Sequence, residues 1–233
     1  MTDSERIKRN ITEIMQSLPP DVELVAAAKT RSADEVNTAV TAGIDAIGYN
    51  YIQEAERMRP LVGGTVPWHM IGHLQRNKVK KAVELFDMIE TIDSERLALE
   101  VNKQSAALDK VMPVLIEINS GKESNKSGVL PENAIGLICR IHHLSHLTIV
   151  GLMTMGPRFG NPKDARPYYR ITKRIFDEIR QAELPGVEMR YLSMGMSNSY
   201  QIAIAEGANV IRIGTALFGE RAEKRNIPLI TRN

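Results

Sequence analysis

Short apolar runs alternate with amphipathic helical patterns along this chain, and this alternation restricts the possible folds more than any other feature. Nearly continuous apolar runs are typical of parallel strands that helices cover, because such strands have no face in solvent. About eight runs occur, at residues 23–28, 46–48, 68–71, 88–91, 112–118, 148–153, 189–193 and 209–213. Helical patterns follow them, roughly at 32–42, 51–59, 76–85, 94–109, 131–141, 164–182, 198–206 and 215–224.

About eight strand–helix units in 233 residues predict an α/β fold of the (β/α)8 TIM-barrel class. An extra amphipathic helix, about 4–18, precedes the first strand and stops before Pro19-Pro20. We expect a single domain over residues 1–233, because there is no low-complexity tract or Gly/Ser linker. A doubly wound open sheet is the structural alternative.

Composition narrows the possible partners and locations. No apolar stretch approaches the roughly 20 residues of a membrane helix and the first residues have no apolar signal core, so we expect a cytoplasmic protein. The net charge of +2 comes from 30 basic and 28 acidic residues mixed along the chain, which does not favour nucleic-acid binding. The single cysteine, Cys139, lies in an apolar series and is expected to be a buried structural thiol.

The active sites of such barrels are built from the loops after the strands, so residues at strand ends are the candidates. Lys29 directly follows the first strand run. Apolar walls around its stem would disfavour the ammonium form, and a neutral amine can attack an aldehyde. Alternatively, Lys29 only ends the strand and extends its amine into water.

The loops after the last two strands have the composition of an anion site. Ser197 and Asn198 can cap the helix expected at 198–206, and with the backbone of Gly214 and Thr215 they could hold one phosphate group. Plain capping and tight turns are the alternative. Because the first and eighth strands are neighbours in a closed barrel, the amine of Lys29 and this anion site would adjoin. Pyridoxal 5′-phosphate (PLP) needs both groups.

Longer motifs carry a resemblance to a known family. The segments 28–30, 48–54, 68–78, 151–155, 192–197 and 212–214 together resemble the YggS/PROSC family of pyridoxal phosphate homeostasis proteins, in the same order over nearly the whole chain. The resemblance implies a barrel like the N-terminal domain of alanine racemase, with PLP bound as a Schiff base on Lys29.

The same resemblance implies roles for further residues. Asn50 would contact the cofactor, and Arg212 would face its pyridine nitrogen. Ser197, Gly214 and Thr215 would hold the phosphate. His73 follows the third strand run; it either lines the pocket or faces solvent, and we include it among the expected cofactor-binding residues.

No metal site is predicted, because His69 and His73 straddle a strand end instead of sharing one face of a helix. The chain departs from the family pattern at two positions. Tyr49 stands where the family usually has a glutamate, and Ser199 where it commonly has an aspartate. We expect both near the pocket mouth, with cofactor binding retained.

Arg212 bears on whether the cofactor is used or only carried. Arginine offers only hydrogen-bond donors, so it favours the unprotonated pyridine ring and weakens its capacity as an electron sink. We therefore expect a protein that buffers PLP and delivers it to PLP-dependent apoenzymes, without robust catalysis. One alternative is a PLP-dependent amino-acid racemase-like enzyme. Another is an aldolase-like barrel in which Lys29 attacks a sugar-phosphate carbonyl.

Overall fold

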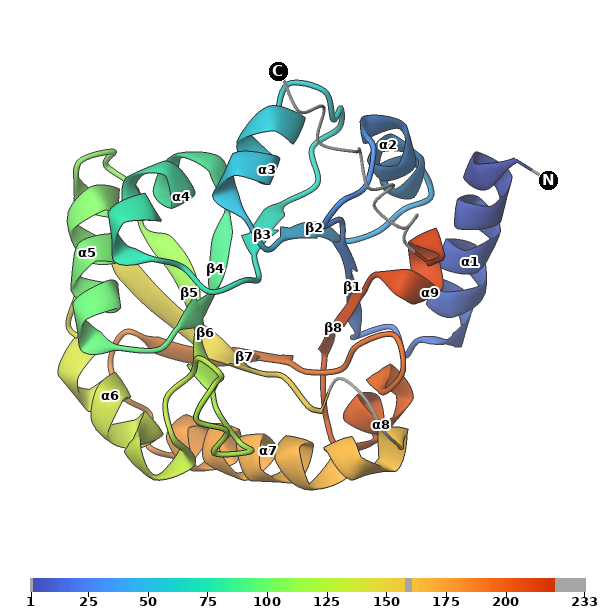
Figure 1. The fold of residues 1–233 in the computed structure, drawn as a ribbon. Coiled ribbons are helices and arrows are strands. Elements are labelled where there is room, and N and C mark those ends of the chain that lie inside the picture. Colours follow the sequence, from blue (N-terminus) through green and yellow to red (C-terminus); the bar gives the residue numbers. More distant parts are fainter. Residues whose placement is uncertain (1, 158–160, 221–233) are drawn as a thin grey trace, which may run out of the picture.

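The structure is a computed structural model, and it describes residues 2–157 and 161–220. Eight parallel strands form a closed barrel in which each strand pairs with the next and β8 pairs with β1 (Figure 1). The strands are β1 Glu23–Ala27, β2 Ala46–Tyr49, β3 Trp68–Met70, β4 Met88–Ile92, β5 Met112–Ile118, β6 Leu147–Thr154, β7 Val187–Ser193 and β8 Val210–Ile213.

The helices surround the barrel, and α1 precedes the first strand. The α-helices are α1 Asp3–Ser17, α2 Ala33–Thr41, α3 Ile52–Met58, α4 Val79–Leu85, α5 Glu95–Ala106, α6 Ala134–Ile141, α7 Arg166–Gln181, α8 Tyr200–Ala205 and α9 Thr215–Phe218. Short 3-10 helices are η1 Arg76–Lys78, η2 Pro131–Asn133 and η3 Pro162–Ala165. The prediction of a (β/α)8 barrel with an extra N-terminal helix is confirmed. Part of the last predicted helix, 221–224, lies outside the described residues.

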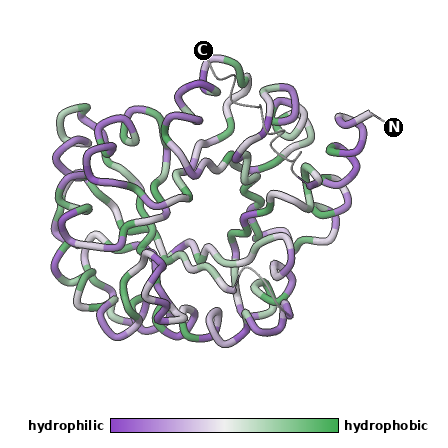
Figure 2. Tube along the Cα trace, in the orientation of Figure 1, coloured by the Kyte–Doolittle hydropathy of each residue, from purple (hydrophilic) through white to green (hydrophobic). Residues whose placement is uncertain are grey.

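Strand residues that point outward pack beneath the helices and form the main hydrophobic core. Hydrophobic residues recur along the strands and hydrophilic ones along the outer helices (Figure 2). Leu115, Val150 and Met153 form a separate apolar cluster within the strands β5 and β6. This arrangement is the usual one for a barrel, in which packed side chains fill the interior.

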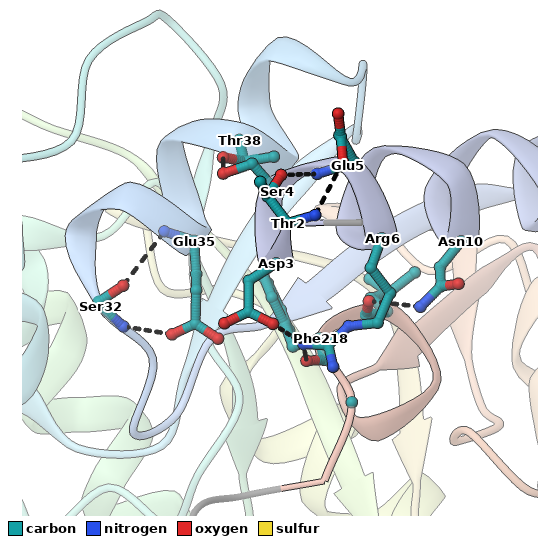
Figure 3. A network of polar contacts seen from close by, with 12 residues as sticks. Thr2, Asp3, Ser4, Glu5, Arg6, Asn10, Ser32, Glu35, Thr38 and Phe218 are labelled. Atoms are coloured by element: carbon teal, nitrogen blue, oxygen red, sulfur yellow. Dashed lines mark hydrogen bonds and ion pairs between the residues drawn. The ribbon is translucent and has the colours of Figure 1, made fainter.

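Helix α1 is attached to the end of the chain's last described helix, α9 (Figure 3). Asn10 Nδ2 donates to the carbonyl of Leu217 at 3.0 Å, and Arg6 Nη2 donates to that of Phe218 at 3.2 Å. These carbonyls lie in the last turn of α9, where a helix leaves its carbonyl groups without internal partners. The contacts with α1 therefore close the barrel's outer layer between β8 and β1.

Cys139 is exposed, so the expectation of a buried thiol is wrong. The helix period explains the difference: Leu137, Ile138 and Ile141 face the core, whereas Cys139 and Ile135 share the opposite side of α6. An apolar series within a helix does not by itself bury each of its members. Among the described helices, none is both long enough and apolar enough to span a bilayer.

Candidate functional site

A cavity of about 770 Å³ lies at the carboxyl ends of the strands. This volume is within the usual range of small-molecule sites, about 300–1,000 Å³. Its lining comes from loops after several strands and consists of Ala27, Lys29, Arg31, Asn50, Ile71, Lys126, Met155, Gly156, Met196, Ser197, Asn198, Arg212, Gly214, Thr215 and Ala216.

The structure brings together six of the seven predicted site residues. The six that line the cavity are Lys29, Asn50, Ser197, Arg212, Gly214 and Thr215. His73 is not part of this lining; its side chain is 56% exposed and its Nδ1 lies 3.7 Å from a carboxylate oxygen of Asp93. The loop after β3 therefore turns this imidazole toward solvent.

Lys29 lies just past the end of β1, half-buried, with its Nζ 5.0 Å from the centre of the Tyr51 ring. The next residue, Thr30, has a φ of +65°, which is uncommon for a residue with a side chain. The backbone N–H of Thr30 donates to the carboxylate of Glu54 on α3, which fixes this turn. The chain is thus held in an unusual conformation immediately beside the candidate amine.

Strand pairing brings Lys29 close to Gly214, one of the residues expected to hold a phosphate. Ala26 pairs with Ile213 between β1 and β8, so Ala27 is opposite Gly214. A Cβ added at Gly214 would lie 3.3 Å from the carbonyl oxygen of Ala27, so the two strands leave little room for a side chain there. Lys29 follows Ala27 by two residues and therefore points into the same cavity.

The candidate anion-binding segment comprises Ser197, in the loop after β7, and residues 214–216 at the start of α9. The hydroxyl of Ser197 accepts hydrogen bonds from the backbone N–H groups of Gly214, at 3.3 Å, and Ala216, at 3.2 Å. Two backbone donors thus converge on one polar atom in the cavity wall. Backbone N–H groups in a short loop of small residues before a helix can bind a phosphate, so this segment is the candidate anion site.

Ser197 and Asn198 do not cap the helix that follows β7, so that expectation is wrong. The N-cap of α8 is Ser199, and the helix begins at Tyr200. In the turn after β7, the Ser197 hydroxyl instead accepts hydrogen bonds from the backbone N–H groups of Gly214 and Ala216. Asn198 lines the cavity and is exposed.

The two positions that depart from the family pattern do not lie at the pocket mouth. Tyr49 is fully buried against Trp68, with ring centres 5.1 Å apart, and burial raises the pKa of its hydroxyl. Ser199 is buried and its hydroxyl lies 2.8 Å from that of Tyr169. The expectation that both residues lie near the pocket mouth is therefore wrong. Both side chains pack in the protein interior.

Arg212 reaches the cavity from β8 and is only 5% exposed. Its Nη1 donates to the hydroxyl of Ser193, and its Nη2 donates to the carbonyl of Thr154 at 2.9 Å. Nη1 also lies 3.7 Å from Oε2 of Glu90, a carboxylate with no exposed surface. Three strands thus fix the guanidinium at the wall of the cavity.

Glu90 is ionised, with partners on two sides. Its Oε1 lies 2.8 Å from Nδ1 of His69, and its Oε2 accepts from the Ser193 hydroxyl at 2.6 Å. Burial raises the pKa of Glu90, but the hydrogen bond and charge of His69, the charge of Arg212 and the Ser193 hydrogen bond together bring it below its usual range.

Sequence reasoning missed this carboxylate. The signal was present, because Glu90 is a charged residue inside an apolar strand run, and strand alternation places it on the same face as Met88. It also missed Arg31, which lines the cavity while its guanidinium is bound by Glu35 and by carbonyls at the end of α9. In the part of the chain that is described, no group of three or more His, Cys, Asp or Glu residues could hold a metal ion.

Comparison with known proteins gives the class first. Residues 2–222 match the family model described as alanine racemase, N-terminal domain. This match and the closed barrel define a protein of the alanine racemase N-terminal domain type.

Comparison with individual proteins is more specific. A pyridoxal phosphate homeostasis protein of Aquifex aeolicus is 38% identical over 200 residues, which cover 85% of this chain and 87% of the relative. One of Pasteurella multocida is 35% identical over 222 residues, covering 93% and 95%. The structure of PipY of Synechococcus elongatus PCC7942, with PLP bound, has a TM-score of 0.84 at 31% identity and covers 91% of this chain and 100% of PipY. The chain belongs to the family of pyridoxal phosphate homeostasis proteins.

Proposed function

We propose that this protein binds PLP in the cavity at the carboxyl ends of the strands, as a Schiff base on Lys29, and acts in PLP homeostasis by holding the cofactor. The observation that carries the proposal is the position of the Lys29 amine and the backbone donors of Gly214 and Ala216 in one cavity of about 770 Å³. An aldehyde with an anionic tail requires those two features together. PipY, a relative of this chain, was solved with PLP bound.

The residues present fit each part of the cofactor. The N–H groups of Gly214 and Ala216 and the hydroxyl of Ser197 would hold the phosphate, with Thr215 beside them. Arg212 would face the pyridine nitrogen, and Asn50 would contact the ring from the loop after β2. His73 has no part in this assignment because it lies outside the cavity lining.

We expect the protein to hold PLP without turnover because the residue assigned to the pyridine nitrogen, Arg212, is only a hydrogen-bond donor. Arg212 has no acceptor group, so the ring nitrogen stays unprotonated and stabilises a carbanion poorly. A racemase needs a second base beside the cofactor, and Tyr49, which could in principle be one, is buried and does not line the cavity. The named relatives are homeostasis proteins. Incubation of the loaded protein with L-alanine and chiral analysis tests this point: D-alanine above a cofactor-only control would establish a racemase.

The binding proposal is tested by titrating the protein with PLP and recording the absorbance in the visible and near-ultraviolet range. The wild type should gain a band that borohydride reduction abolishes, with the added mass on Lys29. Lys29→Arg keeps the charge but cannot form an imine, so it should lose the band. Lys122→Arg, at an exposed lysine with a surface ion pair, is the matched control and should retain it. A wild-type protein that gains no band with excess PLP contradicts the proposal.

Delivery to PLP-dependent apoenzymes is part of the proposed role. The cavity wall is made of loops at an open end of the barrel, so a bound ligand has a path to solvent. Mixing the loaded protein with an apoenzyme, and comparing the rate of activation with that by an equal amount of free PLP, tests delivery. The same rate in a sample with excess competing lysine as a scavenger would support protected transfer, and inhibition by the scavenger would contradict it. The cytoplasmic location stays a prediction.

A further inference from the structure

The charge of Arg212 is balanced inside the barrel, away from the cavity. A guanidinium that is only 5% exposed is costly unless it is paired and hydrogen-bonded. Within the described residues, the ion pair that Arg212 makes is the one with Glu90, at 3.7 Å. Glu90 lies on β4 and Arg212 on β8, so the pair spans the interior of the barrel.

Ser193 on β7 connects these two charges. Its hydroxyl accepts from Nη1 of Arg212 and donates to Oε2 of Glu90 at 2.6 Å. His69 on β3 holds the other carboxylate oxygen at 2.8 Å and lines a separate cavity of about 360 Å³, beside residues at the starts of the strands. The carboxylate of Glu90 is therefore fixed from two sides, and it fixes Arg212 in turn.

Arg212 has five N–H donors, and the protein uses two of them in hydrogen bonds. Both terminal nitrogens have protein acceptors, Ser193 and Thr154. The Nε–H makes no hydrogen bond with any described residue, and Arg212 lines the cavity. The direction of the Nε–H depends on the contacts that fix Nη1 and Nη2 of the guanidinium.

We propose that Glu90 is a positioning residue for the ring end of the cavity: through Ser193 and its direct ion pair it fixes the Arg212 guanidinium and offsets its charge. This inference rests on the proposed function, in which the cofactor ring lies against Arg212. Removing the negative charge at Glu90 leaves the guanidinium uncompensated, so a bound cofactor experiences a more positive potential and releases protons at lower pH.

The test is a pH titration of the visible absorbance of the PLP-loaded protein. We expect the midpoint in Glu90→Gln to lie about one pH unit below that of the wild type, because a charge about 10 Å away at an effective dielectric constant of about 20 contributes that much. Glu90→Asp retains the charge and should restore the midpoint. A merely structural role would not separate Gln from Asp in this way.

Glu117→Gln is the matched control, because Glu117 is a second buried glutamate of the strands, on β5, and makes no ion pair with Arg212 among the described residues. The charge of Arg212 also acts on Glu117, but without an ion pair, so the midpoint should move by less than half as much as in Glu90→Gln. An unchanged midpoint in Glu90→Gln with PLP bound would overturn the proposal. So would an equal shift in Glu117→Gln, because the effect would then be general to interior substitutions.

Ser193→Ala tests the positioning itself if Glu90→Gln does not fold. Both charges remain in this variant, so the midpoint should stay near that of the wild type. PLP affinity should fall several-fold, because Arg212 loses the hydrogen-bonded connection to Glu90 through Ser193 and keeps only the ion pair at 3.7 Å. Wild-type affinity in Ser193→Ala would exclude positioning through Ser193.

A second arm does not require the cofactor. The urea concentration at the unfolding midpoint is measured, without PLP, for Glu90→Gln, for Arg212→Met and for the double variant. The decrease in the double variant should be smaller than the sum of the decreases in the two single variants. Additive losses would show that the ion pair does not couple the two residues, and the proposal would fail. Failure of the wild type to take up PLP would instead overturn the proposed function, while the urea cycle still reports on the pair.

Discussion

Ser197→Ala tests the anion-binding end of the cavity. In the structure the Ser197 hydroxyl accepts from the N–H groups of Gly214, at 3.3 Å, and Ala216, at 3.2 Å. A bound phosphate would take over these two donors and receive the hydroxyl hydrogen as well. The alanine variant keeps both backbone donors and removes only the hydroxyl.

The size of the effect follows from these distances. A hydrogen bond to a charged group contributes about 1.5–3 kcal/mol, which corresponds to about a 10- to 150-fold change in affinity. The wild type must first give up two hydrogen bonds to Ser197, and the variant does not. Since those two hydrogen bonds are at the long end of the usual range, breaking them costs the wild type little free energy, although the cost is not zero. We therefore expect Ser197→Ala to weaken PLP binding by about 10-fold, at the low end of the range.

The assay compares PLP with pyridoxal, which has the same aldehyde and ring but no phosphate. Ser197→Ala should weaken PLP binding and leave pyridoxal binding within about two-fold, since about 0.4 kcal/mol is the scale of an ordinary packing change. Ser199→Ala is the control on the same loop: its hydroxyl contacts Tyr169 and the backbone N–H of Met196 and does not line the cavity, so its loss should not discriminate between PLP and pyridoxal. Equal losses for both ligands, or no loss for PLP, would refute the assignment of this segment to the phosphate.

Three further predictions concern the folded protein and are checked by urea unfolding. Burial raises the pKa of Glu117, so its contribution to stability is present at low pH and lost as the pH rises through the folded-state pKa. Glu117→Gln should therefore gain stability relative to the wild type as the pH rises above the ordinary range of a carboxyl group, and a difference in stability that does not change with pH would contradict this. Gly195 has a φ of +96°, and an added Cβ would lie 2.8 Å from that of Ala203, so Gly195→Ala should lower the free energy of unfolding by about 1–3 kcal/mol. The buried hydroxyl of Tyr49 has no hydrogen-bond partner among the described residues, so Tyr49→Phe should raise that free energy by about 1 kcal/mol; a decrease would indicate a partner.

The barrel was predictable from sequence because the apolar runs identify the strands, and the helices between them indicate that neighbouring strands are parallel. Apolar runs such as 112–118 are long enough to identify β5 directly, and the alternation of strand and helix leaves few topologies open. Closure of the sheet then follows from the number of units. The helix ends were less predictable, as α9 shows, because tertiary contacts decide where a short terminal helix stops.

The site was predictable where a residue is fixed by strand position and less so where it depends on a loop. Lys29 and Arg212 follow from β1 and β8, whose ends converge in any closed barrel. His73 lies three residues beyond the end of β3, and the direction of the loop cannot be read from local sequence. Glu90 depends on strand alternation together with contacts to three other strands, and only the folded barrel supplies those contacts.

The two ends of the cavity depend on sequence in different ways. Backbone N–H groups at Gly214 and Ala216 supply donors at the anion-binding end, and every residue except proline has such a donor. At the ring end, the direction and charge of Arg212 depend on side chains, notably Ser193 and Glu90. Substitutions that preserve the fold should therefore alter the spectrum and proton affinity of bound PLP more readily than they abolish its binding. We therefore expect the interior of the barrel to influence the electronic state of a bound cofactor as well as its affinity, and the mouth to influence mainly the affinity.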